Sequence, residues 1–454
     1  MKVTAVLLAA GQGKRMKSDL PKVLHPLCGK PMLWHVLEAL KDVGTEKPVI
    51  VVGHGADKVT NYLGDSAQTV LQEPQLGTGH AAIQAEPLLK GKMDYVIVTY
   101  ADMPLLRGEI FKRLLETQRL NTGPLSLLTV IADDPRGFGR IVRKSDGTVE
   151  AIVEEYVATP EQQQICELNV GAYCFKADWF WDALHRIEKN PKKGEYYLTD
   201  IVEIAVRDDL PVQAVVHDDF VETIGINTRV HLSEAETAMR MRINREHMLN
   251  GVSMMDPAST YIDIGVRIGR DTTIVPNTYI HGDTTIGERN VIGPNSIIRD
   301  TAIGNDCKVL ASVTEGAILE DGVDMGPFAR LRKGAHLKSH VHMGNFGEVK
   351  DSTLSEGVKM GHFSYIGNAT IGANTNIGAG TITANYDGEK KHPTEIGEDV
   401  FIGSDTMLVA PVKLGDGART GAGSVVTKNV PEDTLVVGAP ARAIRKLERK
   451  KKKG

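Results

Sequence analysis

The feature that most constrains the fold is an apolar residue that recurs about every six positions through the second half of the chain. A period of six matches neither the 3.6-residue turn of a helix nor the two-residue alternation of a strand. It is typical of a chain that runs straight briefly, turns and repeats, so that three runs complete a triangular coil of about 18 residues. The spacing predicts a solenoid of about nine coils between Ile262 and Val426, in preference to an ordinary β-sandwich. The repeated residues are Ile268, Ile274, Ile280, Ile286, Ile292, Ile298, Ile303 and Val309, then Ile366, Ile371, Ile377 and Ile382, then Ile396, Ile402, Leu408, Leu414, Thr420 and Val426.

Glycine content marks the same half of the chain. Residues 1–250 hold 18 of the 46 glycines and residues 251–454 hold 28, and glycine tolerates the tight corners that a solenoid needs. The repeat is interrupted at Thr383–Glu395, and loops that leave a regular solenoid commonly carry function. Two architectures therefore meet near residue 250.

The first half alternates buried strands with amphipathic helices. Such alternation predicts an α/β domain, Rossmann-like, with a mixed, mostly parallel sheet covered on both faces. The segment 228–249 contains long charged residues and neither Gly nor Pro, so we expect a linker helix at 228–250 between a domain at 1–227 and a solenoid domain at 251–454. The expected strands are Val3–Ala10, Val49–Val52 and Tyr95–Tyr100, and the expected helices lie near 31–43, 78–90 and 107–120.

Composition excludes several classes of function. The net charge of −5 gives no general attraction to nucleic acid or to an anionic membrane, and the basic run 449–453 is interpreted as a solvated tail. No run of about 18 apolar residues is present for a membrane-spanning helix. The four cysteines form no CxxC pair, which argues against a disulfide framework or a zinc site. Because Val3–Ala10 is interpreted as a buried strand rather than a signal peptide, we expect a cytoplasmic protein.

A glycine loop follows the first expected strand. In the run Gly11-Gln12-Gly13-Lys14-Arg15, backbone N–H groups could face an anion where a helix begins. The run is not a P-loop, since no Gly-Lys-Ser/Thr follows, and Met16 replaces the third glycine of a dinucleotide fingerprint. Alone the pattern could be a structural turn, but the cations of Lys14, Arg15 and Lys22 favour a phosphate site.

Asp102 follows the expected strand Tyr95–Tyr100. A carboxylate at the carboxyl end of a parallel strand lies where such sheets bind ligands. An aspartate here could instead cap a helix, but beside a phosphate-binding loop its oxygens favour Mg²⁺.

A second candidate site lies within the predicted solenoid, at His362. A lone histidine is commonly a packing or surface residue. Here Arg330, Arg332 and Lys333 precede it by about two coils, and Glu348 lies between them. A base, an acid and several cations on one wall suit a substrate that is anionic and carries an amine.

Several motifs together resemble a known family. Leu8–Met16 with Pro21-Lys22-Val23-Leu24 resembles the sugar-1-phosphate nucleotidyltransferases, and the repeat resembles the hexapeptide left-handed β-helix, from which we take its hand. Joined in one chain, they resemble the bifunctional enzymes that combine N-acetylglucosamine-1-phosphate uridylyltransferase with glucosamine-1-phosphate acetyltransferase. The resemblance covers nearly the whole chain, and its further motifs are Gln72, Leu76–Thr78, Gly137–Ile141, Glu154, Asn169–Gly171, Gly194–Asp200 and Gly225–Asn227.

For the first domain the resemblance implies uridylyl transfer from UTP to N-acetylglucosamine 1-phosphate, with release of pyrophosphate. It implies that Asp102 and Asn227 bind Mg²⁺, and that Arg15 and Lys22 contact the phosphates as catalytic cations. It assigns the nucleotide to Leu8, Ala9, Ala10, Gly11, Lys22, Gln72, Gly77 and Thr78, and the sugar to Gly139, Glu154, Asn169 and Asn227.

For the second domain the resemblance implies acetyl transfer from acetyl-CoA to the 2-amine of glucosamine 1-phosphate. His362 would take the proton of the attacking amine, and we expect Glu348 to orient it. The phosphate is assigned to Arg332 and Lys350, the sugar to Tyr365 and Asn376, and acetyl-CoA to Ala379, Asn385, Tyr386, Ser404 and Ala422, with Lys391 near its phosphates.

The resemblance also implies a homotrimer in which neighbouring subunits share the acetyl-transfer site. We expect the Thr383–Glu395 loop and the segment after Pro431 to reach across. The expected partners are small-molecule substrates, with no nucleic acid and no membrane. The chain departs from the family pattern at Ala101, where many relatives have Gly, and at Gly438, where some have a CoA-contacting Arg that Arg442 could replace.

Two other interpretations stay open at this point. One is a single-activity sugar-1-phosphate nucleotidyltransferase whose β-helix regulates or trimerises it, and the other is an inert structural stalk. His362, Arg332, Lys350 and the Asn385-Tyr386 pair favour a second active site, because a regulatory solenoid needs none of them.

Overall fold

The structure is a computed structural model that describes residues 1–45 and 47–446, so the basic run at 449–453 lies outside it. Contacts divide the chain into two compact units, Met1–Met239 and Arg240–Gly454. The division falls inside helix α9, Arg229–Leu249, which therefore contributes residues to both units. None of the described helices is both long and apolar enough to cross a membrane.

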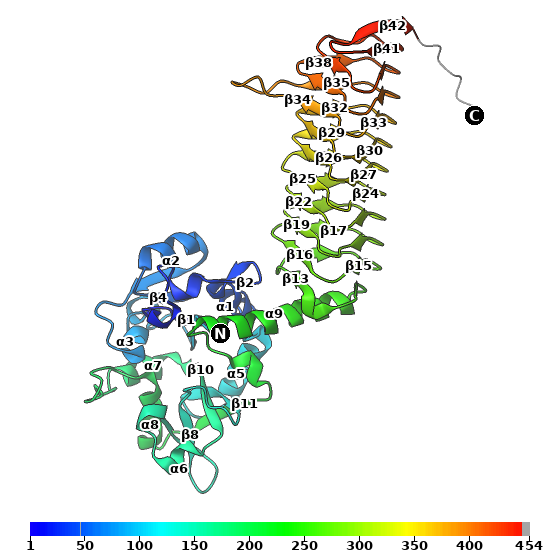
Figure 1. The fold of residues 1–454 in the computed structure, drawn as a ribbon. Coiled ribbons are helices and arrows are strands. Elements are labelled where there is room, and N and C mark those ends of the chain that lie inside the picture. The colour runs from blue at the N-terminus through cyan, green and yellow to red at the C-terminus, as the bar shows by residue number, and fades with distance from the viewer. Residues whose placement is uncertain (46, 447–454) are drawn as a thin grey trace. The chain divides into compact units, whose positions relative to one another are not determined.

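Unit 1 is built on a mixed, mostly parallel sheet (Figure 1). The strands of its main path are, in order, β11 (Val212–His217), β7 (Leu125–Ile131), β10 (Glu167–Lys176), β6 (Tyr95–Tyr100), β1 (Val3–Leu8), β4 (Val49–Val52) and β5 (Gln68–Leu71), and a hairpin of β8 (Arg140–Arg143) and β9 (Val149–Val153) pairs with β10. Within this path only β10 runs antiparallel to its neighbours. The three strands expected from the sequence are β1, β4 and β6, and they lie side by side.

Helices cover both faces of this sheet, because successive residues of its central strands are apolar on both sides. Ala5 and Leu7 of β1 enter one core, and Val6 and Leu8 enter the other. The first core is covered by α1 (Met32–Lys41), α2 (Ala56–Leu63) and α5 (Gly108–Leu120), and the second by α3 (Thr78–Ile83), α7 (Ala177–Leu184) and α8 (Ile201–Arg207). A short α6 (Pro160–Gln163) follows β9.

One expected helix, near 78–90, is in fact two. Helix α3 ends at Ile83, and α4 spans Glu86–Leu89 with Pro87 in its first turn. Proline lacks the N–H that would continue the hydrogen bonds of the preceding helix. The chain therefore starts a new helix at this point.

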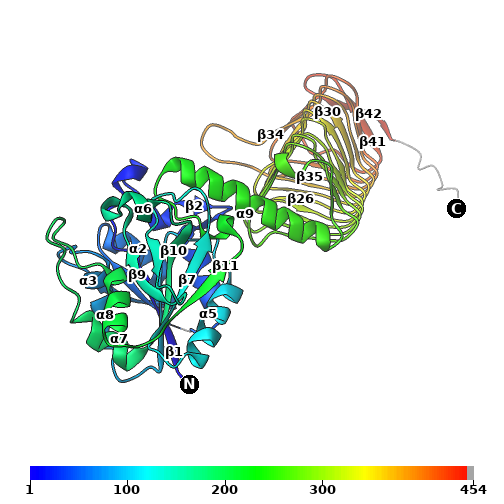
Figure 2. The ribbon, with the colours of Figure 1, turned by 90° about the horizontal axis from the view of Figure 1, so that it is seen from below.

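Unit 2 is a left-handed parallel β-helix of three sheets (Figure 1). Each strand pairs with the third strand along the chain as far as β39 (Arg419–Thr420), which pairs with β41 (Thr434–Val437), and an antiparallel β42 (Arg442–Lys446) follows β41. Seen from below, its coils form a stack of triangular outlines (Figure 2). Equivalent residues of successive coils pair in parallel register, as Ile280 does with Ile298, and both of these side chains are fully buried. The six-residue period thus places one inward side chain on each face of the coil, as predicted.

The strands of unit 2 are short. The 12-stranded sheet contains β12 (Ser253–Met254), β15 (Thr273–Ile274), β18 (Val291–Ile292), β21 (Lys308–Val309), β24 (Asp324–Met325), β27 (His342–Asn345), β30 (Lys359–His362), β33 (Asn376–Ile377), β36 (Phe401–Ile402), β39 (Arg419–Thr420), β41 (Thr434–Val437) and β42 (Arg442–Lys446). The ten-stranded sheet contains β13 (Thr260–Ile262), β16 (Thr278–His281), β19 (Ile297–Arg299), β22 (Val313–Glu315), β25 (Arg330–Leu331), β28 (Glu348–Lys350), β31 (Tyr365–Gly367), β34 (Ile382–Ala384), β37 (Met407–Val409) and β40 (Val425–Val426). The nine-stranded sheet contains β14 (Arg267–Ile268), β17 (Thr285–Ile286), β20 (Ala302–Ile303), β23 (Ile318–Leu319), β26 (Ala335–Leu337), β29 (Ser352–Leu354), β32 (Ala369–Ile371), β35 (Thr394–Ile396) and β38 (Val412–Leu414).

For one coil the sequence pattern predicted the wrong inward residue. Ile382 is only half-buried, whereas Thr383 pairs in register with the inward Leu408 and is 1% exposed. The hydroxyl of Thr383 accepts a hydrogen bond from the backbone N–H of Gly367 at 2.8 Å, so its burial leaves no unpaired polar group. The sequence pattern counted only apolar residues, and here a hydrogen-bonded threonine takes the place of one.

The interruption at Thr383–Glu395 is a loop between β34 and β35 that extends away from the coils in both views (Figures 1 and 2). Its two arms are joined by a bridge between Tyr386 and Lys391. The carboxylate of Asp387 accepts hydrogen bonds from two backbone N–H groups of the turn at 2.8 Å and is bonded to Nε2 of His392 at 2.5 Å. The loop is therefore held by its own hydrogen bonds.

The outward faces of the β-helix differ in polarity. On the ten-stranded sheet the first coils present Tyr279 and Ile297, which are 37% and 41% exposed. At outward register positions of the 12-stranded sheet the middle coils present Lys308, Asp324 and His342. The first coils of the ten-stranded sheet thus offer apolar side chains to a partner, whereas the middle coils of the 12-stranded sheet are polar, although Phe401 is exposed further along that sheet.

An exposed aromatic ladder runs along the corner between the 12-stranded and ten-stranded sheets. Phe328, Phe346 and Phe363 turn this corner in three successive coils, each with a left-handed backbone. Their rings stack with centroids 5.6 and 5.0 Å apart, and the three side chains are between 49% and 64% exposed. Exposed apolar side chains that gather in this way commonly mark an interaction surface.

Candidate active sites

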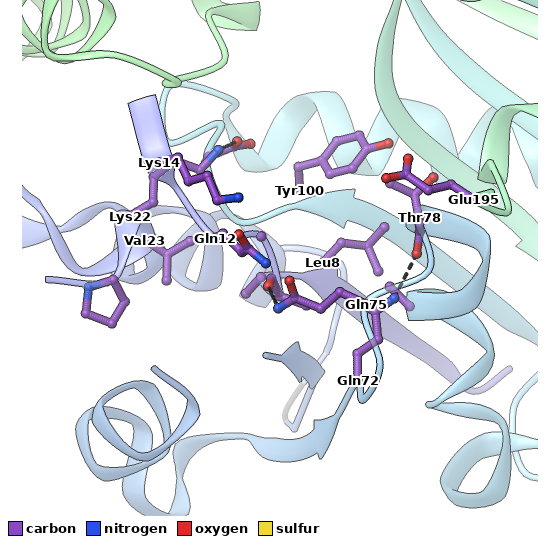
Figure 3. Close-up of a pocket in the computed structure, with 17 residues that line it drawn as sticks. Leu8, Gln12, Lys14, Lys22, Val23, Gln72, Gln75, Thr78, Tyr100 and Glu195 are labelled. Atoms are coloured by element: carbon purple, nitrogen blue, oxygen red, sulfur yellow. Dashed lines mark hydrogen bonds and ion pairs between the residues drawn. The ribbon is translucent and has the colours of Figure 1, made fainter. Parts of the chain in front are cut away.

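Unit 1 contains a cavity of about 530 Å³ where β1 and β6 end (Figure 3). A cavity of this size suits a small organic ligand. The predicted site residues that line it are Leu8, Ala9, Ala10, Gly11, Lys22, Gln72, Gly77, Thr78 and Asp102. Sequence reasoning gave no role to the lining residues Gln12, Pro21, Val23, Gln75, Ala81, Tyr100 and Glu195.

The glycine loop starts at the end of β1 and is fixed to the neighbouring strands. The N–H of Ala9 donates to the carbonyl of Val51 at 2.9 Å, and Nε2 of Gln75 donates to the carbonyl of Ala10 at 2.5 Å. Gly13 has a φ of +60°, and a side-chain carbon there would lie 3.0 Å from Cβ of Lys22. Glycine at this position therefore allows the loop and Lys22 to approach each other.

The cavity has a basic end and a polar end. Lys14 and Lys22 lie toward one end, whereas Thr78 and Glu195 lie toward the other (Figure 3). At the polar end, Nε2 of the buried Gln72 donates to the carbonyl of Gly77 at 2.9 Å, and the N–H of Leu198 donates to Oγ1 of Thr78 at 2.9 Å. These bonds fix the wall of this end before any ligand binds.

Lys22 joins the two predicted metal ligands. Its Nζ forms an ion pair with the carboxylate of Asp102 and donates to Oδ1 of Asn227 at 3.1 Å. The N–H of Ile226 donates to the carbonyl of Asp102 at 2.9 Å, which holds the chain of Asn227 beside it. The side chains of Lys22 and Asp102 are 14% and 18% exposed. Two oxygen atoms from distant parts of the sequence therefore face one positive charge.

The oxygen atoms of Asp102 and Asn227 fit a hard cation. Within residues 1–45 and 47–446, no group of three or more His, Cys, Asp or Glu side chains could hold a metal ion. Mg²⁺ does not require such a group, because it is commonly bound through one or two carboxylates while substrate phosphates and water supply the other ligands. A carboxylate and an amide oxygen that already meet at one ammonium are suitable donors.

The predicted sugar residues form a network behind Tyr100, which lines the cavity. Oε1 of Glu154 accepts a hydrogen bond from Oγ1 of Thr199 at 3.0 Å, and burial raises the pKa of this carboxyl. Burial also raises the pKa of Tyr100, and the charges of Glu154 and Asp102 raise this pKa further. Tyr100 therefore interacts electrostatically with one predicted sugar-binding residue and one predicted metal ligand.

Asn169 and Gly139 belong to the same network. Nδ2 of Asn169 donates to the hydroxyl of Tyr173 at 2.8 Å, and its N–H donates to the carbonyl of Gly139 at 2.8 Å. A side-chain carbon at Gly139 would lie 2.9 Å from Cγ2 of Ile152, so glycine permits the close packing of this strand end. Gly139, Glu154, Asn169 and Asn227 adjoin the residues of the cavity wall but do not themselves line it.

One predicted residue of unit 1 lies outside the cavity. Arg15 does not line it, whereas its neighbour Lys14 does. Ala101, where the chain departs from the family pattern, is fully buried in the apolar core of α1, α2 and α5, so its methyl group does not crowd the cavity. Alternation along a strand end could have indicated which lysine or arginine faces inward, but this loop has no regular period.

In unit 2, His362 ends β30 and pairs in register with Asn345 of the preceding coil. Nδ1 of His362 is hydrogen-bonded to Oδ1 of Asn345. An amide oxygen only accepts, so Nδ1 carries the proton, and Nε2 of the neutral ring is left as the acceptor. The side chain is exposed, so Nε2 can act as a base toward a bound ligand.

The carboxylate of Glu348 contacts Arg332. Nη1 of Arg332 donates to Oε1 of Glu348 at 3.0 Å, and this bond raises the pKa of the guanidinium. The expected orientation of His362 by Glu348 is therefore replaced in the structure by the contact with Asn345. Tyr365 pairs in register with Glu348 on the next coil, so this predicted sugar residue shares the ten-stranded sheet with the predicted phosphate residue Lys350.

Three cations gather beside this sheet. The loop residue Lys391 lies close to Lys350, and the interaction with Lys350 lowers the pKa of Lys391, with a smaller effect of Arg332. Asp351, which forms an ion pair with Lys350 at 3.6 Å, opposes this shift. Like charges this close favour an anion between them. The sequence placed Lys391 with acetyl-CoA, whereas in the structure it lies beside the predicted phosphate residues.

Four predicted residues occupy equivalent positions on successive coils, namely His362, Ala379, Ser404 and Ala422. The carbonyls of the first three accept hydrogen bonds from the N–H groups of Gly380, Asp405 and Gly423, at 3.2, 2.7 and 2.8 Å. These residues form one column along an edge of the β-helix. Asn376 lies on β33 of the 12-stranded sheet, beside the same edge.

The remaining predicted acetyl-CoA residues lie in the projecting loop. Asn385 is buried, and its Nδ2 donates to Oδ1 of Asn368 at 2.7 Å. Tyr386 is 61% exposed, and its hydroxyl donates to the carbonyl of Gly388 at 2.5 Å. The asparagine thus fixes the base of the loop, whereas the tyrosine ring is available for contact.

Known proteins resemble this chain over both units. Residues 5–141 match the family model of the MobA-like NTP transferase domain, and residues 265–300 and 393–428 match the model of the bacterial transferase hexapeptide (six repeats). A protein named bifunctional protein GlmU from a Geobacillus species is 47% identical over 442 residues, covering 97% of this chain and 96% of its own length. Proteins of the same name from Geobacillus thermodenitrificans and Streptococcus agalactiae are 48% and 45% identical, covering 97% and 96% of this chain and 96% and 95% of their own lengths.

Asp200 should make the stability of unit 1 depend on pH. Burial, with repulsion from Glu203 and Glu154, raises the pKa of Asp200 from 3.8 to about 6. Between these values the folded state keeps the proton that the unfolded state loses, so the free energy of unfolding falls as pH rises. We expect Asp200→Asn to be more stable than the unsubstituted protein at pH 7, and this advantage to shrink toward pH 3. Urea unfolding at both pH values measures this difference in the free energy of unfolding, with Asp218→Asn at an exposed position as control. An equal effect of both substitutions would contradict the prediction.

Proposed function

The chain belongs to the family of bifunctional GlmU proteins, and from that premise we propose how its residues perform the two reactions of the family. The protein is an enzyme of UDP-N-acetylglucosamine synthesis with uridylyltransferase and glucosamine-1-phosphate N-acetyltransferase activities. The single-activity interpretation is less favoured, because the similarity covers both units. We propose functional boundaries at 1–227 and 251–454, joined by 228–250.

The proposed order is acetylation in unit 2 followed by uridylyl transfer in unit 1. Acetyl-CoA and UTP are the proposed co-substrates, with glucosamine 1-phosphate and N-acetylglucosamine 1-phosphate as acceptors. All of these are phosphorylated anions, and this fits the cations that gather at both sites. We propose that the enzyme acts in the cytoplasm, where such metabolites are made.

Uridylyl transfer is assigned to the cavity of unit 1. The observation that carries the assignment is the ammonium of Lys22, which joins Asp102 and Asn227 beside the glycine loop. A phosphate oxygen of the sugar attacks the α-phosphorus of UTP, the bond to the β-phosphate oxygen breaks, and pyrophosphate leaves. Lys14 and Lys22 bind the phosphates and reduce the repulsion between the two anions, as does Arg15 in this proposal. No protein nucleophile takes part.

Asp102 and Asn227 would hold Mg²⁺, which when bound would neutralise charge on the phosphates. The remaining residues bind and orient. Gln72, Gly77 and Thr78 form the wall that we assign to the uridine. The sugar is assigned to the network of Gly139, Glu154 and Asn169, behind Tyr100.

Acetyl transfer is assigned to the column and the cationic cluster of unit 2. The observation that carries it is the bond between Nδ1 of His362 and Asn345, which leaves Nε2 as the base. The amine of glucosamine 1-phosphate attacks the thioester carbonyl while Nε2 takes its proton. The C–S bond breaks, and the proton on His362 can pass to the leaving thiolate. Arg332, Lys350 and Lys391 bind the substrate phosphate.

The acetyl donor is assigned to the edge of the β-helix and its projecting loop. Ala379, Ser404 and Ala422 continue the column that His362 begins, so a long ligand placed along it would have its thioester near the base. Tyr386 of the loop is exposed beside the buried Asn385. Tyr365 and Asn376 are the proposed contacts of the sugar ring.

The proposed assembly is a homotrimer formed by the β-helices. Of the three faces, the ten-stranded sheet presents Tyr279 and Ile297 outward, and the phenylalanine ladder runs along one of its edges. The substrate cations lie on the same sheet as these apolar residues. A second copy packed against this face would therefore enclose the acetyl-transfer site.

Asp102→Ala should abolish pyrophosphate release and spare acetyl transfer. The substitution removes the counter-charge of Lys22 and one proposed Mg²⁺ ligand, whereas unit 2 keeps all its residues. Pyrophosphate release from UTP and free CoA thiol, measured on one preparation, check the prediction, and a chelator added to the unsubstituted protein should have the same selective effect. The exposed Asp65→Ala is the control. Equal loss of both activities in a folded protein would contradict separate sites.

His362→Ala should lower acetyl transfer by about 10²–10⁴-fold, the usual contribution of a positioned base. Uridylyl transfer should persist when N-acetylglucosamine 1-phosphate is supplied. His336→Ala, at a histidine that bonds Glu320 on a nearby coil, serves as the matched control and should acetylate normally. A His362→Ala protein that acetylates at the normal rate would contradict the assignment of His362 as the base.

Light scattering should give about three times the chain mass of 49.3 kDa. Ile297→Asp on the ten-stranded sheet should reduce this mass and lower acetyl transfer, because a charge would be buried between subunits. Ile318→Asp, at a similarly exposed isoleucine of the nine-stranded sheet, should keep the trimer. Uridylyl transfer should persist in both. A monomer with full acetyltransferase activity would rule out the shared site.

A further inference from the structure

The segment that carries Lys22 has little regular structure of its own. It contains two single 3-10 turns, η1 (Lys14–Met16) and η2 (Lys22–Leu24), separated by a left-handed Lys17. Residues 17–20 are exposed. Met16 and Val23 are buried, but the exposed residues 17–20 between them do little to fix the position of Lys22.

Arg229, the first residue of helix α9, contacts both ends of this segment. Its Nε donates to the carbonyl of Met16 at 3.3 Å, and its Nη1 donates to Nδ1 of His25 at 3.4 Å. His25 is 3% exposed, and burial, together with the charge of Arg229, lowers its pKa. The ring is therefore neutral at pH 7 and can accept the hydrogen bond. A planar guanidinium holds two acceptors at a fixed separation.

These contacts form a closed path that includes Lys22 and one proposed metal residue, Asn227. Lys22 bonds Asn227, the chain continues two residues to Arg229, and Arg229 returns to Met16 and His25 on either side of Lys22. Arg229 itself is not among the residues that line the cavity. Any effect of Arg229 on a reaction there is therefore indirect, and its contacts with Met16 and His25 point to the position of Lys22.

A second contact keeps the helix beside this part of the chain. Oε2 of Glu236 accepts a hydrogen bond from the N–H of Cys28 at 3.0 Å, in the turn between β2 (Pro26–Leu27) and β3 (Lys30–Pro31). Glu236 follows Arg229 by about two helical turns, so both lie on one face of α9. The loss of Arg229 alone would leave the hairpin attached.

We propose that Arg229 is a positioning residue for uridylyl transfer, because it holds Met16 and His25 so that Lys22 meets Asp102 and Asn227. The proposal rests on the assignment of uridylyl transfer to the cavity of unit 1. It predicts a defect in chemistry rather than in folding, because Arg229 fixes a local segment and Glu236 keeps its own contact.

The test uses the full chain with Arg229→Ala, Arg229→Lys and, as control, Arg245→Ala at an exposed position of the same helix. We expect Arg229→Ala to lower kcat for pyrophosphate release by about 10²-fold at saturating UTP and Mg²⁺, the usual effect of a displaced catalytic group. The kcat of Arg229→Lys should lie between those of Arg229→Ala and the unsubstituted protein, because an ammonium lacks the planar group that holds two acceptors. Added guanidinium ion should restore part of the rate of Arg229→Ala. The release of CoA thiol and the unfolding temperature should match those of Arg245→Ala.

A second readout does not depend on activity. Lys22 is paired and 14% exposed, so an amine-reactive ester should label it slowly, as read by peptide mass spectrometry. We expect faster labelling of Lys22 in Arg229→Ala and unchanged labelling in Arg245→Ala.

Three results separate the possibilities. Normal kcat together with normal labelling of Lys22 in Arg229→Ala would overturn the proposal. A lower unfolding temperature with no rescue by guanidinium would also overturn it, since Arg229 would then be structural. An unsubstituted protein that releases no pyrophosphate would refute the proposed function, whereas faster labelling of Lys22 in Arg229→Ala would still support the positioning role.

Discussion

Parallel pairing of strands fixes where both proposed active sites lie. Neighbouring parallel strands end at the same edge of a sheet, so the chain after β1 and the chain after β6 bring Gly11 and Asp102 to one cavity. In unit 2 the same pairing stacks equivalent residues of successive coils, and this sets His362 beside Asn345. The backbone ladder thus gathers side chains that are distant in sequence, and their own contacts only refine the arrangement.

The two units balance their cations in different ways. In unit 1, Lys22 is compensated by a carboxylate and an amide oxygen, so the charge is already satisfied in the protein without substrate. In unit 2, Glu348 compensates Arg332 and Asp351 pairs with Lys350 at 3.6 Å, while repulsion by Lys350 lowers the pKa of Lys391. Repulsion between like charges is relieved when an anion binds. An anion bound between Lys350 and Lys391 would relieve this repulsion, whereas binding at the first site exchanges one set of partners of Lys22 for another.

The sequence predicted what is periodic and missed what depends on exact coil length. The six-residue repeat predicted the β-helix, and strand ends predicted Gly11 and Asp102 as site residues. The contact between His362 and Asn345 was missed because it depends on register, and coils differ in length: Ile280 pairs with Ile298, but Ile298 pairs with Thr314, which no apolar pattern would select. The contact between Lys391 and Lys350 depends on the path of a loop that has no period at all.

The column of equivalent positions in unit 2 means that the number of coils sets a length along the β-helix. Neighbouring strands of a sheet lie about 4.8 Å apart, so each coil adds this length. His362 and Ala422 are three coils apart, which is roughly 14 Å. Adding or deleting a whole coil between them would change this length by the spacing of one coil and would leave the register of every other coil intact. The length of ligand that such a scaffold accepts is therefore counted in coils, and it can change in whole steps without redesign of either end.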